Sequence, residues 1–408
     1  MARGIITALD IGTSTVTTVI AKKQKDESLQ ILGIGVSPSF GVRRGVVVDL
    51  EDVTSAIRRS LQEASRAAGV SPKSVNLAVG GSHLSVLSSR GVVAVSRADG
   101  EISDEDVRRA IAAAETFIPK NPNKEILHII PKDFKVDNES GIKDPIGMNG
   151  VRLEVDTLVV ECSSHFLKNI FKCVESAGVG ISDYVFSAIA AAEAVLSKRQ
   201  KELGVMLLDI GGGTANFVVY EEGVPMHAGV LPFGGNHITN DIAIGFRTAV
   251  DIAEEIKLKH GSCLPLELAK KEIVRLSDFI PGEEANYSRK ELAEIIEARL
   301  CDIFELVQKE LKKIDRVALL PAGVVLIGGS ARIPGIVDLI KRELKLPAEV
   351  GIPREFSESI DESASTILAS PLGVISWADK NGSGRSDDFI ARSRAASSLK
   401  KWFQSFLP

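Results

Sequence analysis

The stretch that says most about the fold runs from Met206 to Tyr220 and reads Met-Leu-Leu-Asp-Ile-Gly-Gly-Gly-Thr-Ala-Asn-Phe-Val-Val-Tyr. Two apolar runs flank an acidic residue and a row of glycines, which predicts two strands joined by a tight turn. The chain opens with the same pattern over residues 5–21, and Leu9–Gly12 and Leu208–Gly211 both read Leu-Asp-Ile-Gly. We therefore expect two similar halves. A ligand held between them would meet both turns.

Helical patterns follow the strand patterns in both halves. Apolar residues at helical spacing predict helices over residues 53–68, 103–117, 249–259, 289–312 and 333–344. The second of these opens with Ser103, a good N-cap, followed by acids in the first turn. Strands that alternate with helices predict an α/β fold.

Composition excludes several classes of protein. The chain has 408 residues, enough for two to four domains, with 44% hydrophobic and 25% charged residues. A net charge of -5 gives the chain no overall electrostatic attraction to nucleic acid, so we expect no nucleic-acid partner. No apolar stretch approaches the roughly 20 residues of a membrane span, and the N-terminus lacks a secretory signal. Four widely spaced cysteines indicate neither disulfides nor a zinc site.

Both glycine turns are candidate phosphate cradles, because backbone N–H groups in such a turn surround a concavity that only small residues leave open. A plain hairpin explains one such turn, but two copies at matching places favour a ligand. The expected phosphate-binding residues are Gly12, Thr13, Ser14 and Thr15 in one turn and Gly211, Gly212, Gly213 and Thr214 in the other. Asp10 and Asp209 would face a shared Mg²⁺, since this ion prefers carboxylate and phosphate oxygens.

A third glycine-rich stretch, residues 324–335, reads as a strand, a turn and a helix start. Its glycines would allow a flat base to pass closely, and an arginine side chain can stack on one. The residues concerned are Gly328, Gly329, Ser330 and Arg332. The alternative is a strand-to-helix turn without a ligand.

Together these motifs resemble the ATPase superfamily of actin, sugar kinases and the large heat-shock chaperones. The resemblance extends to Phe233-Gly234-Gly235-Asn236, similar to a glycine pair near the phosphates, and to Glu254 and Lys257, where relatives hold the ribose and base. It covers most of the chain. It implies two lobes with ATP and Mg²⁺ in the cleft between them.

Within that superfamily the chain resembles the bacterial cell-division family FtsA. The stretches that carry this likeness are Asn76–His83 and Asp144–Glu154, which bracket the subdomain that FtsA inserts. The implied architecture has six parts: a first actin-like core domain (1–82, 161–198 and 360–378), an inserted FtsA-type subdomain (83–160), a second actin-like core domain (199–235 and 311–359), its smaller subdomain (236–310), a flexible linker (379–388) and a C-terminal amphipathic helix (389–408).

One residue departs from the pattern of relatives that hydrolyse ATP. These present a Glu or Gln to the attacking water, where this chain has Ser187. A hydroxyl is a poor general base at neutral pH, so help worth about 10² to 10⁴-fold would be missing. Asp209 is the remaining candidate catalytic residue. We therefore expect tight ATP binding with weak or slow hydrolysis at most.

The last twenty residues form an amphipathic pattern on a polar linker. A helix over residues 394–407 would be about 20 Å long, too short to cross a bilayer and suited to lying in its surface. Its membrane-binding residues would be Arg394, Leu399, Lys400, Lys401, Trp402, Phe403, Phe406 and Leu407. Basic residues without acids favour anionic lipids. The alternative is that this helix docks on its own domain.

Three functions remain open. The FtsA resemblance implies an ATP-binding protein that polymerises, ties filaments of FtsZ to the cytoplasmic face of the cell membrane at the septum by binding the FtsZ C-terminal tail, and recruits later division proteins. The second possibility is a PilM-like adaptor of a type IV pilus machine, a class not expected to carry a basic amphipathic tail. The third is a sugar kinase or a chaperone, but only 73 residues follow Gly335, too few for a peptide-binding domain.

Overall fold

The computed structural model describes residues 4–119, 121–269, 271–357 and 359–381, and contains two five-stranded sheets of the same design. In each, three antiparallel strands continue into two parallel ones. The first sheet has the order β11-β6-β1-β2-β3, with β1 Ile5–Ile11, β2 Thr15–Lys23, β3 Leu29–Pro38, β6 Ser74–Val79 and β11 Gly180–Phe186. The second has the order β14-β13-β12-β17-β18, with β12 Val205–Ile210, β13 Ala215–Glu221, β14 Val224–Leu231, β17 Val324–Ile327 and β18 Ala348–Val350. The predicted internal repeat is confirmed.

Two helices lie between the sheets and join them. Neighbouring residues of a strand point to opposite faces, so Ala8 packs into the central core while Leu9 packs outward. The second sheet divides in the same way, with Leu207 in the central core and Leu208 outside it. The helices of the central core are α4 Ser187–Val195 and α10 Glu362–Asn381. α4 is rich in alanine and buried on nearly all sides, and Glu193 is its one ionisable residue.

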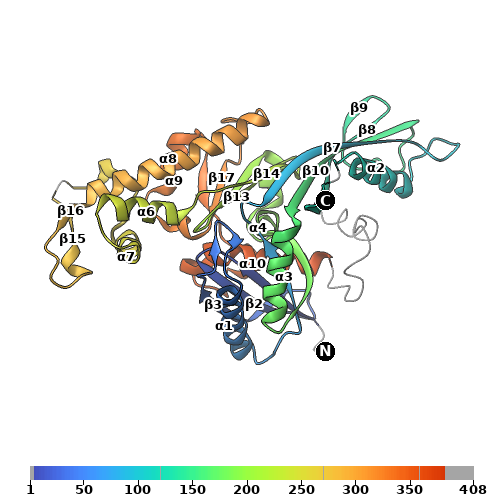
Figure 1. Cartoon of the computed structure of the whole chain (residues 1–408). Helices are drawn as coiled ribbons and strands as arrows, with labels where there is room; N and C mark the ends of the chain where they lie inside the picture. The colour runs from blue at the N-terminus through green and yellow to red at the C-terminus, as the bar shows by residue number, and fades with distance from the viewer. Residues whose placement is uncertain (1–3, 120, 270, 358, 382–408) are drawn as a thin grey trace.

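Further helices cover the outer faces (Figure 1). The first lobe, formed by the first sheet, is covered by α1 Leu50–Ala68 and α3 Ser164–Ser176. The second lobe, formed by the second sheet, carries α6 Gly235–Gly245, α7 Val250–His260, α8 Arg289–Lys313 and α9 Ile336–Leu344, with α5 Lys198–Leu203 at its edge. The helices predicted from the sequence are confirmed. α9 begins three residues later than predicted because Pro334 and Gly335, the latter with φ 86°, form a turn before it.

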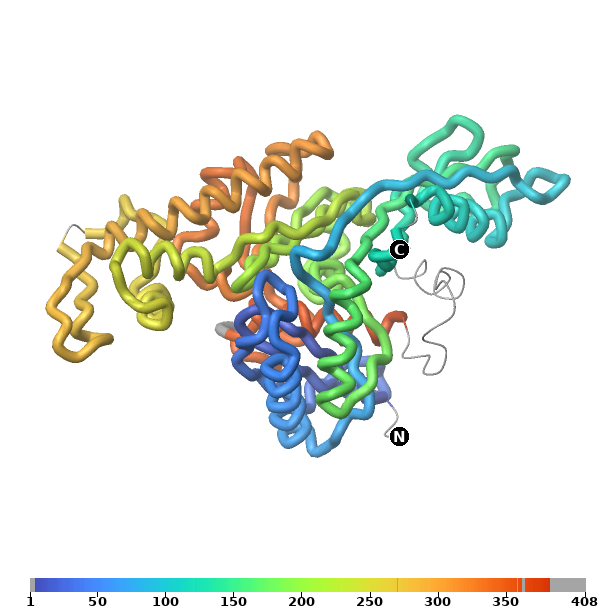
Figure 2. The backbone as a smooth tube through the Cα atoms, in the orientation of Figure 1, coloured from blue at the N-terminus to red at the C-terminus, as the bar shows by residue number. Residues whose placement is uncertain are grey.

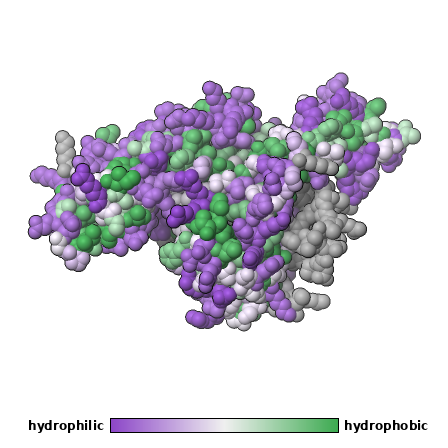
Figure 3. All heavy atoms as spheres, in the orientation of Figure 1, coloured by the Kyte–Doolittle hydropathy of each residue, from purple (hydrophilic) through white to green (hydrophobic). Residues whose placement is uncertain are grey.

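Figure 2 shows the two lobes together with an arm on the side opposite α6–α8. Figure 3 shows a largely hydrophilic surface with apolar groups gathered on both lobes. Smaller elements complete the lobes: β4 Val42–Arg43 and β5 Val46–Val47 form a hairpin in the first, and β15 Ile273–Arg275 pairs with β16 Asn286–Ser288 in the second. Among the helices described, none is both long and apolar enough to cross a membrane.

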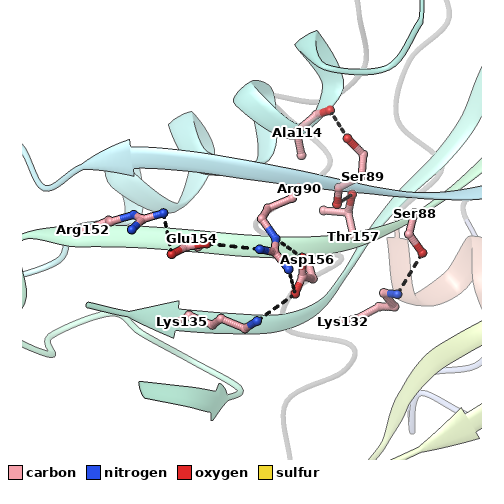
Figure 4. Close-up of polar contacts among 10 residues, drawn as sticks. All are labelled: Ser88, Ser89, Arg90, Ala114, Lys132, Lys135, Arg152, Glu154, Asp156 and Thr157. Carbon is pink, nitrogen blue, oxygen red and sulfur yellow. Dashed lines mark hydrogen bonds and ion pairs between the residues drawn. The ribbon is translucent and has the colours of Figure 1, made fainter. Parts of the chain in front are cut away.

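The arm is a separate four-stranded sheet with one helix. Its order is β7-β10-β8-β9, with β7 Leu84–Ala94, β8 Lys124–Val136, β9 Glu139–Ile142 and β10 Arg152–Ser163. One face packs on α2 Asp104–Thr116, whose predicted N-cap Ser103 forms a capping box with Asp106. The opposite face carries a ladder of ion pairs, drawn in Figure 4: Arg90–Asp156 at 2.8 Å, Lys135–Asp156 at 3.4 Å and Arg152–Glu154 at 2.9 Å. The arm is therefore an amphipathic layer with its own small core.

The segment 379–388, predicted as a flexible linker, begins with helix. α10 continues to Asn381, so that prediction is wrong for its first three residues. Two ion pairs extend the helix: Asp379 with Lys23 at 3.0 Å and Lys380 with Glu193 at 2.7 Å. A run of polar residues gives no sign of such pairs, because the partners come from β2 and α4. The amphipathic segment 389–408 lies outside the described residues.

Candidate functional site

The two glycine turns have the same backbone closure. The N–H of Gly12 donates to the carbonyl of Thr15 at 2.9 Å, and the N–H of Gly211 donates to the carbonyl of Thr214 at 3.0 Å. Each turn joins the first two strands of its sheet, β1–β2 and β12–β13. The repeat seen in the sequence is thus a repeat of geometry.

The turns meet each other across the two lobes. A Cβ on Gly212 would lie 2.0 Å from the Oγ of Ser14, and one on Gly213 would lie 2.5 Å from the Oγ1 of Thr13. Only glycine permits an approach this close. The structure therefore brings Gly12–Thr15 and Gly211–Thr214 to one place, which we call the junction.

Two carboxylates end the strands that lead into the junction. Burial raises the pKa of Asp10 to about 6. Burial, and then the charge of Asp10, raise the pKa of Asp209 to about 7. When two carboxylates lie close together, the charge of one disfavours ionisation of the other. A divalent cation bound between them neutralises both charges and removes that penalty. Asp10 and Asp209 thus fit Mg²⁺, provided that phosphate and water supply the other ligands. In the described part of the chain, no group of three or more His, Cys, Asp or Glu side chains is placed to hold a metal.

The pair Gly234 and Gly235 fastens α6 to the second turn. The N–H of Gly235 donates to the carbonyl of Gly211 at 2.9 Å, and that of Asn236 donates to the carbonyl of Gly212 at 2.8 Å. A Cβ on Gly234 would lie 2.4 Å from the carbonyl oxygen of Gly211. These glycines are needed for the close packing of helix on turn. They lie at the junction, and two of the helix's first amides donate to the second turn.

Glu254 and Lys257 form an ion pair of 2.6 Å on α7. Lys257 also donates to Thr239 at 2.8 Å and to the carbonyl of Gly235 at 3.3 Å. A Cβ on Gly235 would lie 3.0 Å from the Oγ of Ser330. The structure thus brings this pair together with the third motif. The charge of Lys257 is largely compensated by Glu254.

The third motif is a strand end followed by a short 3-10 helix, Gly329–Arg332. Gly328 has φ 87°, and a Cβ on it would lie 2.4 Å from the Oδ1 of Asp209. A Cβ on Gly329 would meet no atom within 4 Å, so that side of the motif is open. Arg332 is exposed at the end of the same turn. The fold therefore requires glycine at position 328, whereas no contact within the protein requires glycine at position 329.

Three residues at or near the junction were missed by the sequence analysis. Asn216 on β13 hydrogen-bonds to Asp209 and counteracts the rise in the pKa of that acid. A Cβ on Gly80 would lie 2.7 Å from the Oγ of Ser187, which is buried and has no hydrogen-bond partner among the described residues. Arg44 lies at the tip of the β4–β5 hairpin, with its Cα 3.0 Å from the position of a Cβ on Gly213. The Arg-Arg-Gly run at residues 43–45 was the available signal for that residue.

Two comparisons with known proteins, one with family models and one with curated relatives, agree on a family. The family model described as "Cell division protein FtsA" matches residues 206–373, and the one described as "SHS2 domain inserted in FTSA" matches residues 81–161. Cell division protein FtsA of Borreliella burgdorferi is 36% identical over 99% of this chain and 99% of its own length. Its counterpart in Pseudomonas aeruginosa is 34% identical over 98% of this chain and 97% of its own length. That of Bacillus subtilis is 39% identical over 85% and 78%.

Solved structures share the fold. The PilM-PilN type IV pilus biogenesis complex has a chain with TM-score 0.66 and 16% identity, covering 91% of this chain and 97% of its own. MreB5 of Spiroplasma citri bound to ADP has TM-score 0.54 and 16% identity, covering 93% and 97%. At such identities the likeness shows the fold alone, and it confirms the predicted actin-like α/β architecture with an inserted subdomain. With family models in both the second lobe and the arm, and relatives matched over nearly the whole chain, the protein belongs to the cell division protein FtsA family.

Proposed function

We propose that this chain binds ATP with Mg²⁺ at the junction, polymerises, and tethers FtsZ filaments to the cytoplasmic face of the membrane at the division septum. The observation that carries the proposal is the meeting of two matching glycine turns, each preceded by an aspartate, across two lobes of a division-family protein. The domain boundaries 1–82, 83–160 and 236–310 given above, with the rest of that division, belong to the same proposal.

Different residues of the junction would bind different parts of the nucleotide. The turn amides of Gly12–Thr15 and Gly211–Thr214 would hold the phosphates, while Asp10 and Asp209 would hold Mg²⁺. The ion supplies positive charge that neutralises the phosphates. Glu254, Lys257, Gly328, Gly329, Ser330 and Arg332 would hold the nucleoside, and the open side of Gly329 supports this placement.

Ser187 supports slow turnover. Its Oγ is buried beside Gly80 and near Asn216, which hydrogen-bonds to Asp209. A serine hydroxyl can orient a water but does not accept its proton at neutral pH. The chain would therefore act by holding ATP and changing shape or assembly, with Asp209 as the only candidate for proton transfer.

The FtsZ C-terminal tail would bind to the smaller part of the second lobe. Large apolar side chains are exposed there: Ile244 at the end of α6, Leu258 on α7 and Leu266 beyond it. Figure 3 shows apolar groups gathered over this part. Exposed apolar groups rimmed by polar ones support a protein-binding surface.

The tail would anchor the protein, and polymerisation would strengthen the anchor. Burying its aromatic and leucine side chains contributes a few kcal/mol, at roughly 1.5–3 kcal/mol for each fully buried side chain. Its basic residues add about 1 kcal/mol each near an anionic surface. One helix would bind reversibly, but several tethers on one polymer insert almost intramolecularly and hold far more firmly. Later division proteins would then gather at the attached filament.

The test is co-sedimentation with liposomes of anionic phospholipid in ATP and Mg²⁺, comparing the full chain with one that ends at Asp387. The shorter chain keeps all of α10, so its fold and thermal stability should match those of the full chain. We expect only the full chain to pellet with lipid. If neither chain pellets, the membrane tether is wrong and a PilM-like adaptor becomes the better proposal. If the shorter chain also melts earlier, the tail packs on its own domain.

A further inference from the structure

The two phosphate turns of the junction supply no cation of their own. Neither turn, Gly12–Thr15 or Gly211–Thr214, contains a basic residue, and two aspartates stand beside them. Lys257 is committed to Glu254, and Arg332 lies on the open third motif. A triphosphate adds further negative charge that Mg²⁺ removes only in part. A triphosphate bound at the turns would therefore need a further cation, and the fold places one beside them.

That cation is Arg44, at the tip of the β4–β5 hairpin. Its backbone has φ 51°, a left-handed conformation that an arginine rarely adopts and that the surroundings must hold in place. Ser82 donates from its backbone N–H (3.3 Å) and from its Oγ (3.2 Å) to the carbonyl of Arg44. The N–H of Gly45 donates to the Oγ1 of Thr13 at 3.1 Å. A Cβ on Gly45 would lie 2.4 Å from the Cα of Gly81. The hairpin tip is thus fastened directly to the first phosphate turn.

The backbone of Arg44 touches the second lobe. Its Cα lies 3.0 Å from where a Cβ on Gly213 would be, so the hairpin from the first lobe touches the turn of the second. Burial lowers the pKa of His237, and the nearby charge of Arg44 lowers it further. His237 is in the first turn of α6, where its Nδ1 accepts from the N–H of Gly234 at 3.1 Å. The charge of Arg44 is thus felt at the first turn of α6, which follows the second phosphate turn.

Arg44 is also available for an anion. Among the residues that the structure describes, it forms no ion pair, and its side chain is exposed. Other arginines with ion pairs, such as Arg90 and Arg299, are held by carboxylates at 2.6–2.8 Å. A guanidinium matches a phosphate geometrically and donates two parallel hydrogen bonds to it.

We propose that Arg44 reaches across from the first lobe to the terminal phosphate of a nucleoside triphosphate held between the two turns. It would thereby distinguish a triphosphate from a diphosphate and draw the lobes together when the triphosphate is bound. The proposal rests on nucleotide binding at the junction and adds to it the residue that recognises the third phosphate.

Neighbouring Arg43 provides a matched control. It is exposed, carries the same charge and belongs to the same hairpin, where it pairs with Val46 on β5. The variants are Arg44→Gln, which keeps much of the length and the backbone strain while removing the charge, Arg44→Lys, which keeps the charge, and Arg43→Gln. Each is made in the full chain. Thermal melting without nucleotide shows whether each variant folds, and titration with ATP and with ADP in Mg²⁺ gives the two affinities.

We expect Arg44→Gln to weaken ATP binding about 10- to 100-fold, the range for losing a hydrogen bond to a charged group, while ADP affinity changes less than about threefold. Arg44→Lys should recover part of the loss, and Arg43→Gln should match the wild-type protein for both nucleotides. An equal loss of ATP and ADP affinity, or no loss, in a variant that melts normally would overturn the role of Arg44 alone. If the wild-type protein binds neither nucleotide, the proposed function fails and this inference fails with it. If Arg44→Gln does not fold, Arg44→Lys decides: a reduced preference for ATP over ADP in the folded Lys variant supports recognition of the third phosphate by the guanidinium, and an unchanged preference overturns it.

Discussion

Gly328 and Gly329 are neighbours with different reasons for being glycine. Gly328 combines φ 87° with a clash between any Cβ and the Oδ1 of Asp209, so the protein itself excludes a side chain there. Gly329 has an ordinary φ and open space around the position of a Cβ. A residue that the fold does not require to be glycine, at a predicted ligand site, points to the ligand as the reason.

We expect Gly328→Ala to lower the free energy of unfolding by about 1–3 kcal/mol, from backbone strain and the clash with Asp209. Gly329→Ala should leave it within about 0.5 kcal/mol of wild type. The same Gly329 variant should bind ATP about tenfold more weakly, because its methyl group occupies the space given to the nucleoside. Urea denaturation and nucleotide titration measure the two effects. Wild-type ATP affinity in Gly329→Ala would show that the nucleoside does not lie against this residue.

At the level of helices and strands, a buried ion cluster holds α4, α5 and α10 together. Glu193 on α4 accepts from Lys201 on α5 at 2.5 Å and from Lys380 on α10 at 2.7 Å. Although burial opposes its ionisation, these two cations hold the pKa of Glu193 below its ordinary value. Lys201 also lies 4.8 Å from the ring centre of Tyr220 on β13. The cluster fastens the last turn of α10, from which the C-terminal segment departs, to both lobes.

We expect Glu193→Gln to destabilise the protein by about 3–5 kcal/mol, because it leaves Lys201 buried without its counter-charge. Glu202→Gln is the control, since Glu202 pairs with Lys143 on the surface at 3.2 Å and an exposed pair contributes at most about 1 kcal/mol. Chemical denaturation of the two variants measures the difference. Equal stability of Glu193→Gln and Glu202→Gln would show that the cluster does not hold the three helices.

At the scale of the whole molecule, the inserted arm shares the central hydrophobic core that lies between the two lobes. Ile130 of β8 and Leu158 and Val160 of β10 belong to the central core with α4 and α10. At the same place His128 of β8 accepts a hydrogen bond through Nε2 from the N–H of Phe186 at 3.0 Å, and its ring meets Trp377 edge-on at 5.6 Å. Phe186 directly precedes Ser187, so the arm contacts the backbone that positions the junction.

His128 makes this contact sensitive to acid. Burial lowers its pKa to about 4, against 6.5 in an unfolded chain, so the folded protein binds fewer protons between these values. Stability should therefore fall as pH drops below about 6.5 and level off near 4. In His128→Gln, whose amide oxygen can still accept from Phe186, we expect the melting temperature to fall by several degrees less between pH 7.5 and pH 5 than in wild type.

The control for that measurement is His165→Gln, which changes an exposed histidine of α3 and should keep the wild-type pH dependence. If the His128→Gln and His165→Gln variants lose stability equally on acidification, His128 is not the group responsible.

Much of the architecture follows from local pattern alone. Apolar, β-branched runs on either side of Asp10 and Asp209 predict β1, β2, β12 and β13, and they are apolar throughout because one face of each strand packs in the central core and the other in an outer core. Helical periodicity and the Ser103 cap predict α2, and the repeated turn predicts two lobes that share a junction. These signals come from residues close together in the chain, so they can be recognised before any tertiary contact is known.

Contacts between distant segments had to come from the structure. The ion pair between Lys380 and Glu193 joins residues 187 positions apart in the chain. Local sequence gives no sign of it, so residues 379–381 were wrongly assigned to the linker. Gly80 and Asn216 lie inside motifs quoted above and Arg44 lies in an Arg-Arg-Gly run, but the role of each comes from a neighbour on another strand or lobe, so no motif by itself reveals it. The sequence determines which elements form and which turns repeat, because those depend on nearest neighbours along the chain. Which side chains stand beside the junction is determined only when the two lobes and the inserted arm pack together, because burial and pairing depend on neighbours in space.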